Sequence, residues 1–312
     1  MDLIIDTDPG VDDALAIMVA LASPDVTLHA LTIVHGNVGI DQTTTNALTL
    51  LEQLGIDTVP VYRGADAPLV EDALENAAHV HGIDGLGDAD LGAPKRLRAR
   101  DEHAVNALVR MLNESPGKYT IAAIGPLTNI ALALSLDPEL PEKAAGLMVM
   151  GGAVTGRGNV SNGVAEFNIF SDPEAAQVVF SRWPRFDLCD WEATVAHEFA
   201  PDVVDDWNAA GSAWARVYYA ISRKVTEFVS GRGESGMLRA ADALALAALV
   251  KPELVTRSRQ RYVRVETRGG MRGATWVDWN RRLGRPANAR IIEAVDHDGF
   301  IGLLAQALGV ES

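Results

Sequence analysis

The sequence predicts an α/β fold, in which a mostly parallel, Rossmann-like open sheet carries helices on both faces. Short strand-type runs alternate along the chain with longer stretches whose apolar residues recur at helical spacing. The strand-type runs are apolar throughout, as expected for a parallel sheet that is buried on both faces. No Pro/Ser-rich linker, internal repeat or low-complexity tract divides the chain, so we expect one domain over residues 1–312.

Each expected element rests on one of two patterns: a short apolar run for a strand, or apolar positions at helical spacing for a helix. In chain order the elements are strand Leu3–Ile5, helix Asp13–Leu21, strand Val26–Ile33, helix Gln42–Leu54, strand Val59–Tyr62, strand Tyr119–Ala123, helix Leu127–Leu134, strand Gly146–Met150, helix Pro173–Phe180 and strand Phe186–Cys189. The tail differs from this alternation. There we expect a small antiparallel addition near the C-terminus, formed by Gln260–Glu266 and Thr275–Val277, before a last helix Phe300–Leu308.

The charge and cysteine content exclude several classes of function. Twenty-seven basic and forty-two acidic residues give a net charge of −15, which argues against nucleic acid or an anionic membrane as a partner. The single cysteine, Cys189, excludes an internal disulfide framework and a Cys-based zinc site. The longest apolar run, residues 240–250, is too short to span a bilayer, and the chain shows no secretory signal pattern. We therefore expect a cytoplasmic protein.

Polar or glycine-rich segments follow four of the expected strands. DTDPGVDD follows LII, HGN follows LTIV, IGPLTN follows TIAA, and MGGAV follows GLMV. In an open α/β sheet, ligands bind beyond the carboxyl ends of the strands. We therefore expect these four segments to meet in one crevice.

The first of these segments is unusually acidic. Four aspartates fall within eight residues: Asp6, Asp8, Asp12 and Asp13. A helix cap needs only one carboxylate, and four held close together repel one another unless a cation compensates. No Lys or Arg precedes Arg63, so the sequence nearby supplies no such cation. Asp242 lies in the apolar helical stretch RAADALALA, where a charge is costly unless it is paired, and we expect it to join the same site.

Two kinds of chemistry fit this acidic segment. Carboxylates without a His/Cys cluster suit a hard ion, Ca²⁺ or Mg²⁺, rather than zinc. DTDPGVDD lacks the spacing of an EF-hand loop, and its Asp-x-Asp opening also matches phosphotransferases that use an aspartate nucleophile, here Asp6. The small hydroxyl residue usual after the second Asp is missing, because Pro9 and Gly10 follow Asp8. Phosphoryl transfer is therefore the second choice.

A second polar group lies in GRGNVSNGVAEFNIFSDPEAA, just after the strand that ends in MGG. It contains Asn159, Asn162, Glu166 and Asn168. Amides and one carboxylate suit a polyhydroxylated ligand such as a sugar, because each hydroxyl both donates and accepts. The alternative is a loop that these side chains stabilise through Asx turns.

Taken together, these motifs resemble a known family. DTDPGVDDA, HGN, HVHG, GPLTNIA, MGGA and AEFNIFSDPEAA, in this order, are similar to the motifs of the inosine–uridine-preferring nucleoside hydrolases, from Asp6 to the Asp242 helix. The resemblance implies a nucleoside hydrolase-like fold and the calcium-dependent hydrolysis of the N-glycosidic bond of ribonucleosides, giving ribose and free base in nucleoside salvage. It also implies a homodimer or homotetramer.

The resemblance implies a role for each matching residue of the metal site. The carboxylates of Asp8, Asp13 and Asp242 and the backbone carbonyl of Ile124 would bind one Ca²⁺. Asp8 would also be the general base, taking a proton from a calcium-bound water that attacks C1′ of the ribose. Asp6 is similar to a residue that supports this group from behind.

The resemblance also places the sugar. Asp12, Asn37 and Asn168 would hold the ribose 2′- and 3′-hydroxyls. Glu166 and Asn159 would hold the 5′-hydroxyl end, although Asn162 competes with Asn159 because the loop is one residue longer than the common form. The remaining sugar-lining residues would be Met150 and Phe167.

The sequence departs from the family where the base leaves. Many members have a His immediately before the calcium-binding Asp, and here that residue is Ala241. His81 in HVHG is retained and is a candidate catalytic residue, with His79 the weaker candidate. Purine-specific members stack aromatic residues on the base instead. Four aromatic residues lie in AWARVYYAISRKVTEFV, where core packing is the alternative, and Phe228 is the best placed of Trp214, Tyr218, Tyr219 and Phe228.

Other functions stay open at this point. One alternative is a hydrolase for an unusual N-riboside. Another is a protein that binds ribonucleosides without hydrolysing them, which the missing acid at Ala241 suggests. Covalent aspartyl phosphate and dependence on Mg²⁺ would instead identify the phosphotransferase.

Overall fold

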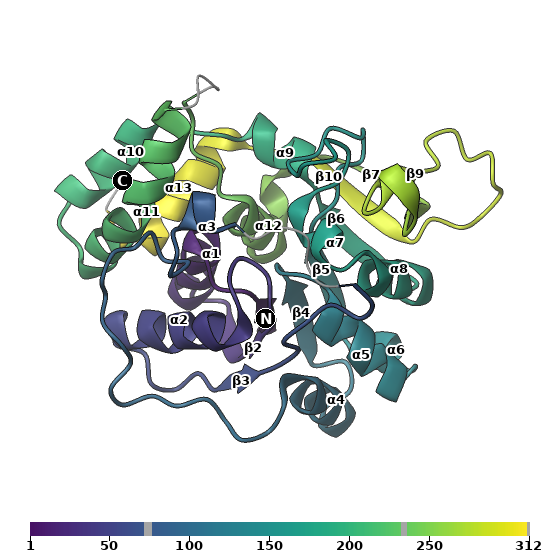
Figure 1. Cartoon of the computed structure of the whole chain (residues 1–312), viewed down its shortest axis with the longest axis horizontal. Helices are drawn as coiled ribbons and strands as arrows, with labels where there is room; N and C mark the ends of the chain where they lie inside the picture. The colour runs from purple at the N-terminus through teal and green to yellow at the C-terminus, as the bar shows by residue number, and fades with distance from the viewer. Residues whose placement is uncertain (72–76, 232–235, 311–312) are drawn as a thin grey trace.

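Eight strands form one sheet that runs through the protein (Figure 1), in a computed structural model that describes residues 1–71, 77–231 and 236–310. In spatial order the strands are β3 (Val61–Arg63), β2 (Thr27–Ile33), β1 (Asp2–Thr7), β4 (Tyr119–Ala123), β5 (Gly146–Met150), β6 (Phe186–Cys189), β10 (Ala289–Val295) and β7 (Val255–Arg261). All neighbouring pairs are parallel except β10 and β7, which are antiparallel. The expected mostly parallel sheet is confirmed.

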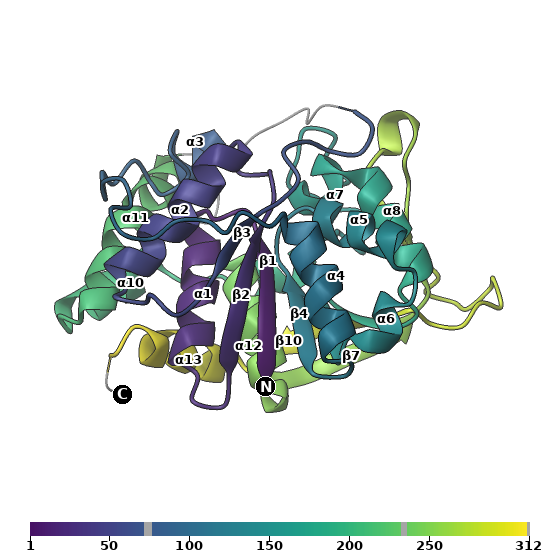
Figure 2. The same cartoon turned by 90° about the horizontal axis from the view of Figure 1, so that it is seen from below.

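Helices cover both faces of this sheet, as Figure 2 shows. One face is covered by these helices: α1 (Val11–Ala22), α2 (Ile40–Gln53), α10 (Pro201–Ala209), α11 (Ala213–Gly231), α12 (Ala241–Val250) and α13 (His297–Ala307). On the other side lie α4 (Ala104–Glu114), α5 (Thr128–Leu136), α6 (Leu140–Lys143) and α8 (Pro173–Arg182). Two large clusters of buried apolar residues, one on each side, join these helices to the sheet. The remaining α-helices of the described residues are short: α3 (Ala78–His81), α7 (Phe167–Ser171) and α9 (Trp191–Ala196).

The apolar character of the central elements follows from their burial. Leu3, Ile4 and Ile5 of β1 are fully buried because the strand lies between β2 and β4 and has helices on both faces. Helix α12 packs against α1, α13, β5 and β6, and its residues from Ala241 to Ala248 are all buried. This explains why the helix is apolar all round rather than on one stripe. It also makes Asp242, in its first turn, a buried carboxylate.

The order of the strands reverses at β1. The chain moves from β1 to β2 and β3 on one side, and then returns to β4 and β5 on the other side. At such a point the two crossover connections leave in opposite directions and open a crevice beyond the carboxyl ends of the strands. The crevice lies between the loop that follows β1 and the loop that follows β4, so the fold places the acidic segment at its edge.

The C-terminal part of the prediction was wrong in one detail. Gln260–Glu266 does not form a single strand of an antiparallel addition, because its first residues belong to β7 at the edge of the main sheet. The rest forms β8 (Val263–Val265), which pairs antiparallel with β9 (Thr275–Val277) in a separate two-stranded sheet. Strand β10 was not expected, because its short run ARIIEAV carries two charged residues and resembles no other strand of the sheet.

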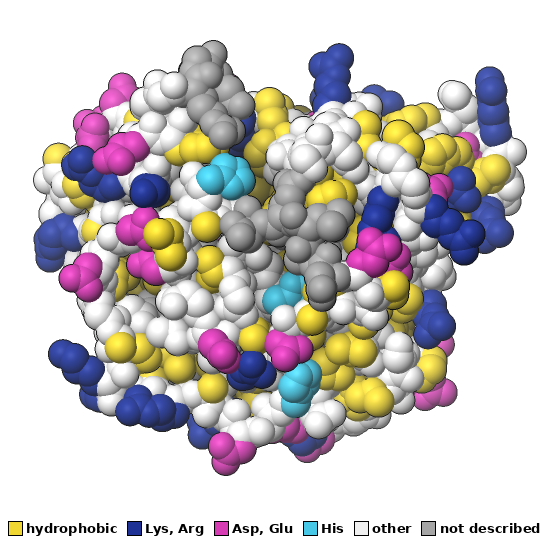
Figure 3. All heavy atoms as spheres, in the orientation of Figure 1, with side chains coloured by type: hydrophobic (Ala, Val, Ile, Leu, Met, Phe, Trp, Pro, Cys, Tyr) yellow, Lys and Arg dark blue, Asp and Glu magenta, His cyan; other side chains and the backbone are white. Residues whose placement is uncertain are grey.

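Charge is unevenly distributed over the surface. Figure 3 shows Lys and Arg side chains gathered at the end of the molecule that carries β7 and β9. Exposed arginines of this segment include Arg257, Arg259, Arg264 and Arg268. Two short 3₁₀ helices, η1 (Pro252–Leu254) and η2 (Gly269–Met271), lie in the same segment. Within the described ranges, none of the helices has both the length and the hydropathy needed to cross a bilayer.

Candidate active site

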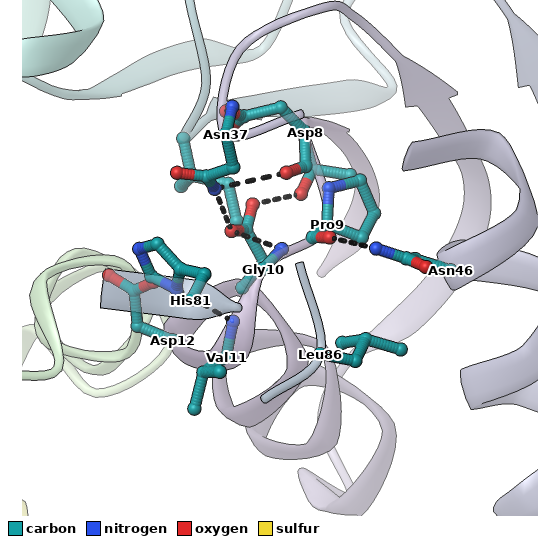
Figure 4. Close-up of polar contacts among 12 residues, drawn as sticks. Asp8, Pro9, Gly10, Val11, Asp12, Asn37, Asn46, His81 and Leu86 are labelled. Atoms are coloured by element: carbon teal, nitrogen blue, oxygen red, sulfur yellow. Dashed lines mark hydrogen bonds and ion pairs between the residues drawn. The ribbon is translucent and has the colours of Figure 1, made fainter. Parts of the chain in front are cut away.

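Asp8 lies at the carboxyl end of β1 and is almost completely buried, with 1% of its surface exposed. Its Oδ2 accepts a hydrogen bond of 2.7 Å from the backbone N–H of Asn37, in the loop after β2 (Figure 4). A Cβ on Gly36 would collide with this carboxylate, and a Cβ on Gly125 would lie 2.5 Å from its other oxygen. The glycines of HGN and IGPLTN are therefore required so that two neighbouring loops can close on Asp8.

Asp13 connects the acidic segment to the start of α1. Its Oδ2 accepts hydrogen bonds of 2.9 Å from the Gly10 backbone N–H and 3.2 Å from Asn37 Nδ2. Its Oδ1 accepts from the Thr7 hydroxyl. Asp13 thus stabilises the helix N-terminus, but its neighbours show that it does more: Asp12, Asp13 and Asp242 each offer a carboxylate oxygen, and these oxygens all lie within 4.8 Å of one another.

Burial makes this group of acids hard to ionise together. It raises the pKa of Asp8 and of Asp242 well above the ordinary value, and the neighbouring acids raise both further. Burial also raises the pKa of Asp12 and Asp13 to about 6. Carboxylates in this state take up either protons or a cation. The cluster offers only carboxylate oxygens, without imidazole or thiol, so its residues fit a hard divalent cation.

The expected metal ligands come from separate parts of the chain but lie close to one another. Asp8, Ile124 and Asp242 line the same cavity, whereas the tightest group of carboxylates contains Asp12 in place of Asp8. The Ile124 carbonyl accepts a hydrogen bond of 2.8 Å from Asn168 Nδ2. That amide also lies 3.3 Å from the Met150 carbonyl, so it connects the loops that follow β4 and β5.

Asp6 lies behind this group and does not line the cavity. Its Oδ2 accepts hydrogen bonds of 2.6 Å from the Thr32 hydroxyl and 2.9 Å from Asn129 Nδ2, while Oδ1 has no partner among the described residues. Burial raises the pKa of Asp6 to about 7. Asn129, in α5, also accepts a hydrogen bond from the Ala65 backbone N–H, so this side chain links Asp6 of β1 to the segment after β3.

Glu166 organises the polar loop after β5, which the sequence analysis associates with a sugar ligand. Its carboxylate accepts hydrogen bonds from three backbone N–H groups, those of Gly152, Asn168 and Ile169, and so caps α7. The side chain is 2% exposed, and burial raises its pKa to about 7 in spite of these hydrogen bonds. Glu166 and Phe167 both line the cavity.

The two asparagines that competed for one role are separated by the structure. Asn159 lines the cavity, and its Oδ1 accepts a hydrogen bond of 2.9 Å from the Phe167 backbone N–H. Asn162 instead accepts hydrogen bonds from the backbone N–H groups of Val164 and Ala165 and donates to the Arg272 carbonyl. Asn162 therefore closes the loop, and Asn159 is the one that a ligand would meet.

The cavity has a volume of about 520 Å³, and its other walls are less polar. His81, on α3, accepts a hydrogen bond of 3.2 Å at Nδ1 from the Val11 backbone N–H (Figure 4). Burial lowers the pKa of His81 to about 4, so at neutral pH the ring is uncharged and carries its hydrogen on Nε2. The rings of His79 and Phe228 meet edge to face, with 5.5 Å between centroids, and both line the cavity.

Of the four aromatic residues proposed for the base, two line the cavity: Tyr218 and Phe228. Trp214 donates a hydrogen bond to the Leu54 carbonyl and packs against the core. Tyr219 lies outside the cavity, with the Arg223 guanidinium 5.7 Å from its ring centroid.

Trp191 and Arg239 are among the lining residues of the cavity that the sequence analysis missed. Trp191 directly follows the strand-end motif FDLCD, so the rule that ligands lie beyond strand ends would have found it. Arg239 stands three residues before Asp242, and nothing in the local pattern marks it.

Known proteins resemble this chain over nearly its whole length. The family model for inosine-uridine preferring nucleoside hydrolase matches residues 3–302. The non-specific ribonucleoside hydrolase RihC of Escherichia coli O1:K1 is 39% identical over 322 residues, covering 99% of each chain. RihC of Salmonella schwarzengrund is 40% identical over 301 residues, which cover 96% of this chain and 95% of the relative.

Solved structures give the same result. An inosine-guanosine nucleoside hydrolase superposes with a TM-score of 0.91 and 34% identity, over 100% of this chain and 99% of the other. A plant nucleoside hydrolase, PpNRh1, superposes with a TM-score of 0.92 and 33% identity, over 98% of each chain. With the family model and close relatives covering almost every residue, the chain is a member of the inosine–uridine-preferring nucleoside hydrolase family, and therefore an N-ribosyl hydrolase.

Proposed function

We propose that this protein hydrolyses the N-glycosidic bond of ribonucleosides with the help of Ca²⁺, giving ribose and free base, within one catalytic domain over residues 1–312. The observation that carries the proposal is a cavity of about 520 Å³ that lies between a buried carboxylate cluster and a wall of apolar and aromatic side chains. Such a cavity suits a ligand with one polyhydroxylated end and one flat aromatic end.

The carboxylate cluster supports a calcium site. Asp8, Asp13, Asp242 and the Ile124 carbonyl are the proposed ligands, and all four are oxygen donors. When bound, Ca²⁺ would supply the positive charge that holds an attacking water and the ribose diol against these oxygens. Because burial and the neighbouring acids raise the pKa of Asp8 and Asp242 well above the ordinary value, a compensating cation would be needed to keep the whole cluster ionised at neutral pH.

Asp8 takes part in the proton transfer, and other acidic and amide side chains of the cavity hold the sugar. Asp8 accepts the proton of the water that attacks C1′, as its burial and its anchored Oδ2 support. Asp12, Asn37 and Asn168 hold the 2′- and 3′-hydroxyls. The 5′-hydroxyl end meets Glu166 and Asn159, with Met150 and Phe167 against the ring. Carboxylates held around C1′ stabilise the positive charge that develops on the sugar.

The less polar wall would receive the base. Phe228 and Tyr218 offer ring surfaces for stacking. His81 is uncharged at neutral pH, so its part in the reaction is to donate a hydrogen bond from Nε2 rather than to act as an imidazolium acid.

The aspartate-nucleophile phosphotransferase is disfavoured by the position of Asp6. That carboxylate has no exposed surface and does not line the cavity, so an incoming phosphate would not reach it. A cytoplasmic location and a homodimeric or homotetrameric assembly, expected from the sequence, stay predictions. Light scattering of the purified protein would determine the assembly.

The decisive experiment is a base-release assay with purified protein on purine, pyrimidine and nicotinamide ribosides, before and after treatment with a calcium chelator. We expect hydrolysis of at least one ribonucleoside, its loss on chelation and its return when Ca²⁺ is added. Activity that survives thorough metal removal would contradict the calcium mechanism. Calcium-dependent binding of ribonucleosides without release of base would identify a binding protein instead.

A further inference from the structure

Arg239 is the one Lys or Arg among the described residues that line the cavity. The other charged side chains there are carboxylates: Asp8, Asp12, Glu166 and Asp242. A guanidinium in such surroundings would be expected to pair with the carboxylate cluster. Among the described residues, an acid that it contacts is Glu198, which does not line the cavity.

Several contacts hold Arg239 in place. Its Nε donates a hydrogen bond of 3.1 Å to Glu198, and both side chains are more than three-quarters buried. The guanidinium carbon lies 5.5 Å from the ring centroid of Trp191, which also lines the cavity. The preceding residue, Leu238, exchanges two backbone hydrogen bonds with Phe199, of 2.7 and 3.0 Å. The arginine is therefore positioned by its neighbours, so its side chain loses less conformational entropy when a ligand binds.

The proposed reaction creates a need for positive charge at the base. The bond between C1′ and the base nitrogen breaks with both electrons going to the base, while a new bond forms between C1′ and the water oxygen, whose proton goes to Asp8. Ala241 brings neither a hydrogen-bond donor nor positive charge to the departing base. A guanidinium is charged at every working pH and donates several hydrogen bonds from one plane.

We propose that Arg239 contacts the departing base and stabilises the negative charge that develops on it as the C1′–N bond breaks. Arg239 is then a catalytic residue for the leaving group, and Glu198 a positioning residue that holds it through Nε. This inference rests on the proposed nucleoside hydrolysis. It assigns leaving-group activation to Arg239 instead of to position 241, where many family members have a His and this chain has Ala241.

The test compares two substrates that share the ribose but whose leaving groups need different amounts of help to depart. One is inosine, whose base leaves poorly, and the other is 4-nitrophenyl β-D-riboside, whose phenolate departs without a donor. We expect Arg239→Met to lower kcat/KM for inosine by about 100-fold, the loss typical of removing one charge-stabilising donor. The same variant should leave kcat/KM for the nitrophenyl riboside unchanged. Arg239→Lys, which keeps the charge, should recover part of the loss on inosine.

A matched control is Arg264→Met. Arg264 also lies over a tryptophan ring, 4.8 Å from the centroid of Trp276, but it is an exposed residue of β8 outside the cavity. It should leave both substrates unaffected. Glu198→Gln keeps the hydrogen-bond acceptor but removes the charge, and it should give a smaller loss that is again confined to inosine.

Two results would overturn the inference: an equal loss on both substrates, which indicates a structural or sugar-binding role, or no loss on inosine. If Arg239→Met does not fold, the same comparison is made with Arg239→Lys and Glu198→Gln. If the unmodified protein cleaves the nitrophenyl riboside but no nucleoside, the inference fails while ribosyl hydrolysis stands. If it cleaves neither, the proposed function fails first.

Discussion

The two ends of the cavity are built in different ways. At the acidic end, most side chains lie in segments that follow strands of the parallel sheet, with Asp242 of α12 as an exception, and several accept hydrogen bonds from backbone N–H groups, as Asp8 does from Asn37 and Glu166 from Gly152. At the other end, the walls come from α3, α9, α11 and the residues before α12, and their contacts are mostly between rings, such as that of His79 with Phe228. One end is rigidly determined by the sheet, whereas the other depends on how several helices pack.

This difference matches the division of tasks that we propose, in which the acidic end holds the sugar and the other end receives the base. Every ribonucleoside presents the same sugar, so the end that holds it gains from a geometry that does not vary. Bases differ in size and in their hydrogen-bonding groups, so the end that receives them gains from walls that change without disturbing the sheet. Mutations at the acidic end should therefore lower turnover on all substrates, while mutations at the other end should change which substrates are used.

The largest effect is expected for Asp8→Asn. The amide cannot accept a proton from the attacking water, so kcat should fall by about 10³-fold or more on every ribonucleoside. Folding should persist, because the substitution removes a buried carboxylate whose pKa is raised. Thermal melting and steady-state kinetics measure the two parts. The control is Asp41→Asn, whose exposed carboxylate pairs with Arg63. Near-normal turnover of the Asp8 variant would remove Asp8 from the mechanism.

The second prediction concerns the cation. Ligand binding to the folded state alone stabilises by about 2.7 kcal/mol at a concentration 100 times Kd, so Ca²⁺ should raise the Tm of the metal-free protein. Asp242→Asn should remove most of this rise, and without metal it should be at least as stable as the unmodified protein, because repulsion with Asp12 and Asp13 is relieved.

Asp190→Asn is a matched control for the cation experiment. Asp190 is also a buried carboxylate, and burial raises its pKa to about 8, but it caps α9 and does not line the cavity. Its variant should keep the full response to Ca²⁺. An identical response in Asp242→Asn would exclude Asp242 from the cation site.

The same difference between the two ends decided how much the sequence revealed. The order of strands and helices and the convergence of DTDPGVDD, HGN, IGPLTN and MGGAV follow from local patterns together with one rule about parallel sheets. Asp242 was recognised because a charge in an apolar helix needs an explanation. Arg239 was missed because an arginine before a helix is ordinary, and only the approach of α9 turns it towards the cavity.

Loops showed the limit of pattern reading most clearly. Asn159 and Asn162 are equivalent in the sequence, and only the backbone path of the loop decides that one lines the cavity and the other bonds to Arg272. In the C-terminal segment, β7 and β8 read as one run because the turn between them leaves no glycine or proline to mark it.

The third prediction tests the less polar end. Phe228→Ala should raise KM for ribonucleosides by about 10-fold, since stacking on an aromatic side chain contributes roughly 1–3 kcal/mol per base. Affinity for free ribose should not change, because the sugar end is untouched. The control is Tyr219→Ala, an aromatic residue of the same helix that lies outside the cavity. A loss of ribose affinity in Phe228→Ala would show that the two ends are not separable in this way.

The smallest effect is expected in the pH dependence of stability, where two glutamates form a natural pair. Glu166 and Glu52 each accept hydrogen bonds from three backbone N–H groups, in the second case those of Lys95, Arg96 and Leu97. Burial nevertheless raises the pKa of Glu166 to about 7, whereas the hydrogen bonds lower the pKa of the solvated Glu52 to about 2. Desolvation therefore outweighs the same set of donors at the acidic end of the cavity.

A carboxyl whose pKa is raised on folding stabilises the protein fully below its unfolded pKa, and this contribution is lost as pH rises through the folded pKa. The contribution of Glu166 to the stability of the metal-free protein should thus decrease as the pH rises from 4.5 to 7. Glu166→Gln, which keeps an acceptor for the backbone, should reduce that decline by an amount on the order of 1 kcal/mol, measured by urea unfolding at each pH. Glu52→Gln should leave the slope over this range unchanged, because the stabilisation by Glu52 is lost only when pH falls towards 2. Equal slopes in the two variants would mean that water reaches Glu166 and that the acidic end is less sealed than its burial indicates.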